Sequence, residues 1–342
     1  MGDMIPLYGF GGKSGRSSAT LTITAPVGAT VTVSKDGKSK PSKVATTGVV
    51  VFKGLETGTW TITITNGTDT ATKTVEIKAD YSATISFNTI PEFTYTGDYE
   101  IVSDDDQPIT VSQGNWKIRF LTSGTLTFTS LNGAENGIDV FLVGGGGGGS
   151  RAAGGGGYTK TLKAVKVTVG TAYAIEVGAG GTAGVGNSKA GGSGGTSNAF
   201  GASANGGKAN GTASSYIGAN GGSGGGAGSS NGAGGQGGSD GSDGFHRNGT
   251  NQDSGKGQGT TTREFGESGG KLYAGGGGGC TTTSSNGGAG GDGGGGDGGN
   301  TSGGATSGAT NTGSGGGGAA NSKAGGSGGS GIVIIRNTRG AA

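Results

Sequence analysis

The side chains that could support catalysis are few and scattered in this sequence of 342 residues. His246 is the only histidine and lies in a polar segment beside Arg247. A Ser-His-Asp triad would depend on it, and the sequence has no nucleophile elbow to supply the serine. The carboxylates, among them Glu135, Asp139 and Glu176, form no pair motif typical of glycosidases. We therefore expect a protein that is not an enzyme.

Metal and cofactor chemistry has little support either. The acidic run Asp104, Asp105 and Asp106 could hold Ca²⁺, but it precedes Pro108 and a solvated turn is the favoured interpretation. The glycine runs lack the G-x-x-x-x-G-K-[ST] pattern that cradles phosphates, and no helix-forming stretch follows them. The single Cys280 excludes an intrachain disulfide framework. We predict no metal and no cofactor.

Charge and hydropathy exclude two classes of partner. The net charge is +2 and the basic residues form no stripe, so nucleic-acid binding has no electrostatic footprint. The first residues, MGDMIPLYGFGGKSG, lack the basic and apolar regions of a secretory signal. No stretch approaches the ~18 apolar residues of a membrane helix, so we expect no membrane insertion.

The elements that would position any site change character near residue 143. All five prolines lie at or before Pro108, whereas 73 of the 90 glycines lie between Gly144 and Gly331. Different forces must therefore hold the two parts together. The predicted organisation is an N-terminal attachment segment, a β-sandwich, a strand segment, and a glycine-rich region closed by a final strand. Their residues are 1–18, 19–80, 81–143, 144–342 and, for the final strand, 331–336.

Residues 19–79 alternate like the strands of a half-buried antiparallel sheet, with turn residues roughly every ten positions. In GTWTITIT, Trp60, Ile62 and Ile64 share one face, which makes Trp60 the predicted core anchor. The order of apolar strand, P-x-G, strand, K-D-G turn and GLETGTWTITI resembles PEGA-like and related immunoglobulin-like modules of bacterial and phage surfaces. This resemblance implies a spacer or an attachment module.

Further strands follow, from YSATISFN at Tyr81 to IDVFLV, and apolar strands recur among the glycines as VKVTVG, YAIEVGAG and GIVIIR. A flexible linker would not need these apolar strands, so their presence argues that the region is folded. We predict one sandwich or jelly-roll-like domain whose sheets begin before Gly144 and close with the last strand. The nonapeptide NSKAGGSGG occurs at 187–195 and 321–329, which indicates two equivalent positions.

Two structures remain open for the glycine tract, a flexible coil and a bundle of polyproline II helices. Collagen is excluded because no proline follows Pro108. In a polyproline II helix the backbone N–H and C=O groups point outward, and only glycine lets backbones approach from every side. Rigid strands at the ends of the tract favour the bundle. The predicted fold class is therefore all-β with an inserted polyproline II bundle.

Aromatic and arginine side chains in the polar insertions of the tract are the candidate binding residues. The receptor-binding set that we predict is Phe245, His246, Arg247, Tyr216 and Phe200. For Tyr216, as for Phe265 and Tyr273, capping of the bundle or packing against the sandwich is the alternative interpretation.

The order NWKIRFLTSGTLTF, IDVFLVGGGGGG, GGGGYTKT, AYAIEVGAGG, GQGTTTREFGE and GGSGIVIIR resembles the glycine-rich domain of phage and prophage tail proteins. Its relatives include tail-fibre adhesins and a domain of an animal receptor tyrosine kinase that binds cytokines. The resemblance implies a receptor-binding protein on the virion, assembled in the bacterial cytoplasm. Its partners would be a host-cell glycan or outer-surface protein and other tail or particle proteins.

Alternatives to the adhesin remain at this point. A non-catalytic capsid or tail decoration protein would have no host receptor, and a depolymerase is a distant third. The resemblance places TTTREFGE in the framework, which argues against receptor contacts for Arg263 and Phe265. The oligomeric state is open, and a homotrimer, common among tail fibres, is one option.

Overall fold

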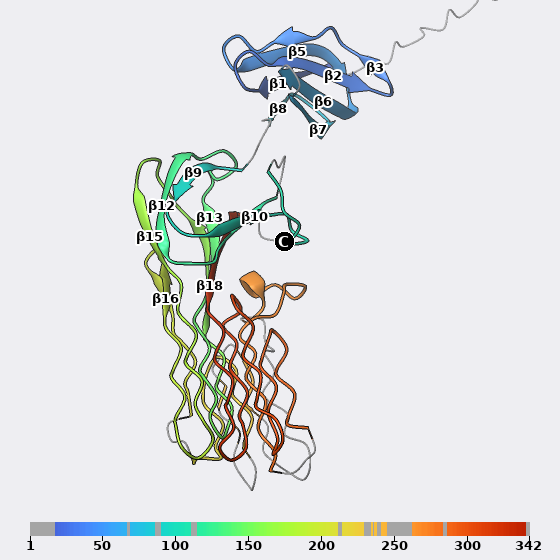
Figure 1. Ribbon diagram of the computed structural model, residues 1–342. Coiled ribbons are helices and arrows are strands. Elements are labelled where there is room, and N and C mark those ends of the chain that lie inside the picture. Colours follow the sequence, from blue (N-terminus) through green and yellow to red (C-terminus); the bar gives the residue numbers. More distant parts are fainter. Residues whose placement is uncertain are drawn as a thin grey trace, which may run out of the picture. The chain divides into compact units, whose positions relative to one another are not determined.

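The computed structural model describes residues 18–66, 69–85, 90–110, 115–210, 214–228, 234, 236–237, 241–244, 262–282 and 286–339. The chain divides into two compact units, Met1–Thr89 and Ile90–Ala342, each built from β-strands (Figure 1). Over the described ranges the helical structure amounts to one short turn, η1 (Glu264–Gly266). Those ranges hold no helix that is long and apolar enough to cross a membrane.

The first unit contains two sheets around one core. Its strands are β1 (Ser18–Thr24), β2 (Thr30–Lys35), β3 (Lys38–Ser39), β4 (Lys43–Val44), β5 (Val49–Glu56), β6 (Gly58–Asn66), β7 (Asp69–Ile77) and β8 (Tyr81–Thr84). The sheet orders are β5-β1-β8 and β3-β2-β6-β7, with β4 also paired to β2. Trp60, Ile62 and Ile64 all point into the core, as their alternation predicts. The Trp60 indole N–H also donates to the Glu56 carbonyl at 2.9 Å.

One strand lies in a different unit from the one expected. Tyr81–Thr84 was predicted to open the second β segment, but β8 pairs in parallel with β1. The physical reason is its apolar side chains, because Ala83 and the following Ile85 complete the core of the first unit. The division between units accordingly falls after Thr89.

The second unit contains two five-stranded sheets. Its strands are β9 (Glu92–Tyr95), β10 (Tyr99–Val102), β11 (Lys117–Phe120), β12 (Gly124–Ser130), β13 (Ile138–Val143), β14 (Thr159–Val165), β15 (Ala172–Glu176), β16 (Ser197–Ala199), β17 (Ala202–Ala204) and β18 (Ile332–Asn337). The first sheet has the order β10-β11-β18-β13-β14 and the second β17-β16-β15-β12-β9. The prediction that the last strand closes the domain is confirmed, because β18 pairs with β13 from Val143↔Ile332 to Ile138↔Asn337.

Strand β13 is an unbroken apolar run because both of its faces are covered. Val140 and Leu142 lie in the core that contains side chains of both sheets. Phe141 and Val143 lie on the opposite face, in a second cluster with Phe265. The rings of Phe141 and Phe265 are 5.8 Å apart. The glycine tract therefore leaves from a strand that is fixed on two sides.

Beyond β13 the chain forms long extended runs that lie side by side and lead away from the sheets (Figure 1). The run at residues 144–149 is wholly buried. Its amides donate to three neighbouring runs in turn, so that every third amide meets the same neighbour. In order along the run, the acceptors are the carbonyl groups of Tyr158, Gly195, Gly329, Gly155, Gly192 and Gly326.

The Cα atoms of the same run face three further neighbours. A Cβ atom added at any position from 144 to 149 would lie less than 3.0 Å from a backbone carbonyl oxygen. In order, these oxygens belong to Asn205, Ala179, Ser314, Lys208, Thr182 and Gly317. Residues 144–149, which we call the central run, are thus enclosed by backbone on all sides, and no other residue type fits there.

Several of the turns between runs lie at the end of the bundle remote from the sheets, which we call the distal end. Turns at 150–153, 185–189, 300–303 and 320–324 belong to it. Two of them touch, since the Gly186 amide donates to the Lys323 carbonyl at 3.0 Å. Val185 also forms an isolated bridge with Ala324.

The two copies of NSKAGGSGG occupy equivalent places, as their identity predicts. Each begins in a distal turn with an asparagine in the left-handed region, Asn187 at φ 66° and Asn321 at φ 50°. Asparagine tolerates this conformation better than most residues. Each copy then returns toward the sheets and accepts hydrogen bonds from the central run. The repeat therefore encodes two neighbours of the central run.

Candidate functional site

The distal end presents polar turns held by a buried cation. Arg151 lies in the turn that ends the central run, and only 7% of its surface is exposed. Its guanidinium donates to the Asn187 side chain and stacks 4.4 Å from the centre of the Tyr216 ring. The Tyr216 carbonyl in turn accepts a hydrogen bond from the Gly228 amide at 2.8 Å. Three turns are thereby joined around one arginine.

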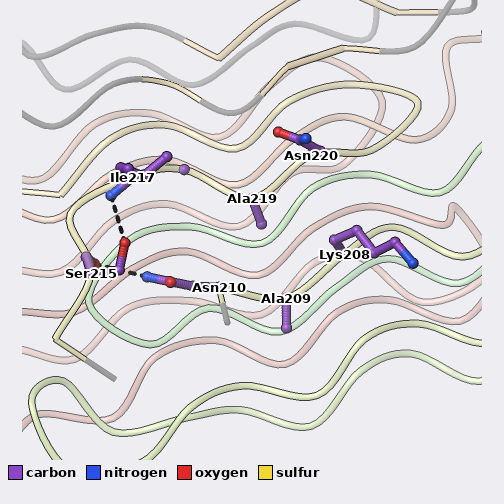
Figure 2. Close-up of a pocket in the computed structure, with 8 residues that line it drawn as sticks. Lys208, Ala209, Asn210, Ser215, Ile217, Ala219 and Asn220 are labelled. Atoms are coloured by element: carbon purple, nitrogen blue, oxygen red, sulfur yellow. Dashed lines mark hydrogen bonds between the residues drawn. The ribbon is translucent and has the colours of Figure 1, made fainter. Parts of the chain in front are cut away.

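A cavity of about 410 Å³ opens beside these turns (Figure 2). Its wall combines polar side chains with the apolar Ile217, which is 57% exposed. Asn210 holds one side by donating to the Ser215 carbonyl at 2.8 Å. The Ser215 hydroxyl accepts from the Ile217 amide at 3.2 Å. Amide, hydroxyl and ammonium groups beside an apolar surface suit a sugar or a polar peptide.

The structure separates the predicted binding residues. Tyr216 lies at the distal end and stacks on Arg151. Phe200 lies at the opposite end of the unit, where its ring packs 5.2 Å from that of Tyr173 in the sheet. Phe245, His246 and Arg247 lie outside the described residues. Gly244, which precedes them, lies against Gly225.

A second candidate site lies where η1 and the segment up to Tyr273 cover the first sheet. Here a cavity of about 570 Å³ is lined by both acids and bases. Asp104, Asp105 and Asp106 form the turn that the sequence predicts, with Asp104 and Asp105 exposed, but two of the three carboxylates are also ion-paired. Asp104 meets Arg339 at 2.6 Å, and Asp106 meets Lys117 at 2.5 Å. Little in the sequence indicates these pairs, because Arg339 lies 235 residues from Asp104 and Lys117 lies 11 residues from Asp106, on the other side of a turn.

Arg336 anchors this cover to the sheet. It is the register partner of Asp139 in the β13–β18 pair. Its Nε and one terminal nitrogen each donate to Asp139 Oδ2 at 3.2 Å. The face of the guanidinium lies 4.0 Å from the centre of the Phe265 ring, and its terminal nitrogens donate to the Glu267 carboxylate. One side chain therefore connects β18, β13 and the segment after η1.

The surroundings move the pKa values of the acids in opposite directions. A hydrogen bond from Arg336 holds the pKa of Glu267 below its ordinary value, and Arg339 does the same for the pKa of Asp104. Burial instead raises the pKa of Glu264, although Lys117 opposes it. Burial also raises the pKa of Tyr273. The cavity thus contains acids whose pKa values are lowered beside one whose pKa is raised.

We expect Glu267→Gln to destabilise the protein at neutral pH and to have little effect in acid. A carboxyl whose pKa is lowered by folding stabilises the fold above its ordinary pKa, and this stabilisation is lost as the pH falls through the folded-state value. The ordinary value for Glu267 is 4.5, so the difference in melting temperature between the variant and the wild type should begin to shrink as the pH falls below that value and should vanish below the lower folded-state pKa. Calorimetry across the acid range measures this. An equal difference at every pH would contradict the assignment.

Comparison with known proteins adds one finding to this geometry. No curated protein matches the chain. A family model described as a glycine-rich domain matches residues 121–338, from the end of β11 through the bundle and β18. The resemblance to glycine-rich domains, predicted from the strand–glycine junctions, is therefore confirmed over more than half of the chain, and the protein belongs to this glycine-rich domain family.

Proposed function

We propose that the glycine tract is a bundle of polyproline II helices. The hydrogen bonds of the central run support this, because each neighbour receives every third amide. A polyproline II helix has about three residues per turn and no internal hydrogen bonds, so its amides point to three sides in turn. In the same proposal the first unit is an immunoglobulin-like module, with the alternating buried strands of its two sheets as support.

On this scaffold we propose a receptor-binding adhesin of a phage tail fibre or tail tip. One observation carries the proposal: the strands lie at one end of the bundle, and a group of polar turns lies at the other. Such a layout presents variable loops on a rigid support, which is how recognition surfaces are commonly built. The ligand class is a host-cell glycan or outer-surface protein, and the first unit would attach the protein to the particle.

Fluorescent full-length protein incubated with candidate host cells tests the proposal. We expect labelling, and we expect Ile217→Ser to reduce it on the order of tenfold, because an apolar anchor in a binding pocket carries much of the affinity. The matched control is Val169→Ser at the opposite end of the unit, since Val169 is 49% exposed and Ile217 is 57% exposed. Joint replacement of Phe245, His246 and Arg247 by alanine tests the sequence-predicted loop in the same assay.

Two outcomes would contradict the adhesin. If no host is labelled and the protein binds phage particles through its first unit, a decoration role fits better. If cells are labelled but neither the Ile217 variant nor the loop variant binds more weakly than the Val169 control, the distal end is not the binding surface.

A further inference from the structure

Three side chains in the cavity beneath η1 are placed for a reaction with one another. Lys117, the first residue of β11, and Glu264 are each only 5% exposed. Lys117 Nζ lies 2.5 Å from Asp106 Oδ1 and 3.1 Å from Glu264 Oε1. It also donates to the Asp104 carbonyl at 3.3 Å. One buried amine is therefore held between two acids that come from separate segments of the chain.

Glu264 is a second acid on the same amine. Asp106 pairs with Lys117 and, at 3.7 Å, with Lys271. Glu264 is buried beside Lys117 as well. Within the described part of the chain, Glu264 Oε1 has no hydrogen bond of acceptable geometry, although it lies within contact distance of Nζ. A buried oxygen that contacts the ammonium but accepts no well-directed hydrogen bond is only partly compensated for its loss of water, which leaves it available to take up a proton.

We propose that Lys117 and Asp106 become joined by an intramolecular amide bond, with Glu264 as the group that transfers protons during its formation. The proposal does not depend on the adhesin function, since it concerns the sheet end of the unit. The product is a covalent link between the turn after β10 (Tyr99–Val102) and the start of β11.

The reaction balances without any co-reactant. The Lys117 ammonium first passes a proton to the Asp106 carboxylate, which leaves a neutral amine and a carboxylic acid. The amine lone pair attacks Asp106 Cγ and the C–N bond forms. Glu264 gives its proton to the departing hydroxyl and takes one from the attacking nitrogen. The C–O bond then breaks, one water leaves, and Glu264 ends as it began.

The surroundings favour the steps in which Glu264 takes part, whereas, despite burial, Lys117 and the nearby cations lower the pKa of Asp106 and oppose the first proton transfer. Burial raises the pKa of Glu264 so that it can hold the proton that it must donate. Holding the amine and the carboxyl in contact replaces a bimolecular encounter by an intramolecular one. Loss of both charges also removes the cost of keeping an ion pair out of water. The other charged groups that face the reacting carboxyl are Lys271, 3.7 Å from Asp106 Oδ2, and the Arg119 guanidinium.

Mass spectrometry of the full-length protein tests the bond directly. We expect the intact mass to be lower than calculated by about 18 Da, the mass of one water. No lysine or arginine lies between Lys78 and Lys117, so trypsin should release residues 79–119 as one peptide, because amide-bonded Lys117 resists cleavage. Fragmentation should show that Asp106 and Lys117 close a ring. An intact mass equal to the calculated one, or a link to Glu264 in place of Asp106, would overturn the proposal.

Two variants separate the role of Glu264 from that of the surrounding charges. Glu264→Gln should have the full calculated mass and release residues 79–117, with its fold checked by circular dichroism. Lys271→Met removes the neighbouring cation and should still lose the water. Loss of water in the Glu264 variant would show that this residue does not transfer the protons. The mass measurement on the wild-type protein tests the bond by itself, so that test remains valid even if a variant does not fold.

Discussion

Replacing Gly147 by alanine is expected to destabilise the second unit by at least about 3 kcal/mol. Its amide donates to the Gly155 carbonyl at 2.8 Å, and its carbonyl accepts from the Gly316 amide at 2.9 Å. The new methyl group would fall against the Lys208 carbonyl and lie 2.9 Å from the Ala209 amide nitrogen. Overpacking usually costs about 1–3 kcal/mol when side chains can move. Here the neighbours are backbone atoms, and separating them also weakens hydrogen bonds of about 0.5–1.5 kcal/mol each.

Differential scanning calorimetry measures the effect. At roughly 2–4 °C per kcal/mol for a unit of this size, the melting temperature should fall by roughly 6–12 °C. The matched control is Gly303→Ala in a distal turn, where the nearest atom to the new Cβ is Asn300 Oδ1 at 3.8 Å. We expect that variant to have the same melting temperature as the wild type. Equal melting temperatures for all three proteins would mean that residues 144–149 are not enclosed and behave as a linker.

The strands of the second unit were predictable because their side chains report their surroundings. Continuous apolar runs such as IDVFLV and GIVIIR indicate strands covered on both faces, and β13 and β18 are such strands. Glycine has no side chain, so a glycine run does not show by its polarity whether it is buried or exposed. The central run and the run at 275–279 look alike in sequence, and only hydrogen bonds between distant segments show which neighbours surround each one. The repeated nonapeptide was informative because its asparagine and lysine mark a turn.

The charged cavity was not predictable for a related reason. Asp139 and Arg336 lie 197 residues apart, and they meet only because β13 and β18 pair in one register. A slip of a single residue would move Arg336 to the other face of the sheet. Likewise, the sequence predicts a turn at Asp104 and Asp106, but it does not predict their ion pairs, because only the strand order places Lys117 and Arg339 beside them. The local sequence therefore predicts which side chains are buried, but it does not predict which distant residues they pair with.

Replacing Arg336 by methionine is expected to have the second large effect, about 3–5 kcal/mol, because it leaves a buried charge without its main partner. Asp139 is fully buried. Without Arg336 it retains the Ala164 amide at 3.1 Å and Lys163, whose side chain is 53% exposed. Chemical denaturation measures the loss. Arg336→Lys should restore only part of it, because a single ammonium can neither bridge two carboxylates in one plane nor stack on Phe265 in the same way.

Two further variants show that the loss comes from the unpaired Asp139 and not from a smaller side chain at position 336. Asp139→Asn combined with Arg336→Met removes both charges, so it should be more stable than Arg336→Met alone. Arg339→Met breaks the Arg339–Asp104 pair, whose side chains are 22% and 50% exposed, and should cost no more than about 1 kcal/mol. If Arg339→Met were as harmful as Arg336→Met, or if the double variant were no better than the single one, burial of Asp139 would not be the cause. Apolar contacts alone would then hold η1 and the segment up to Tyr273 against the β13–β18 pair.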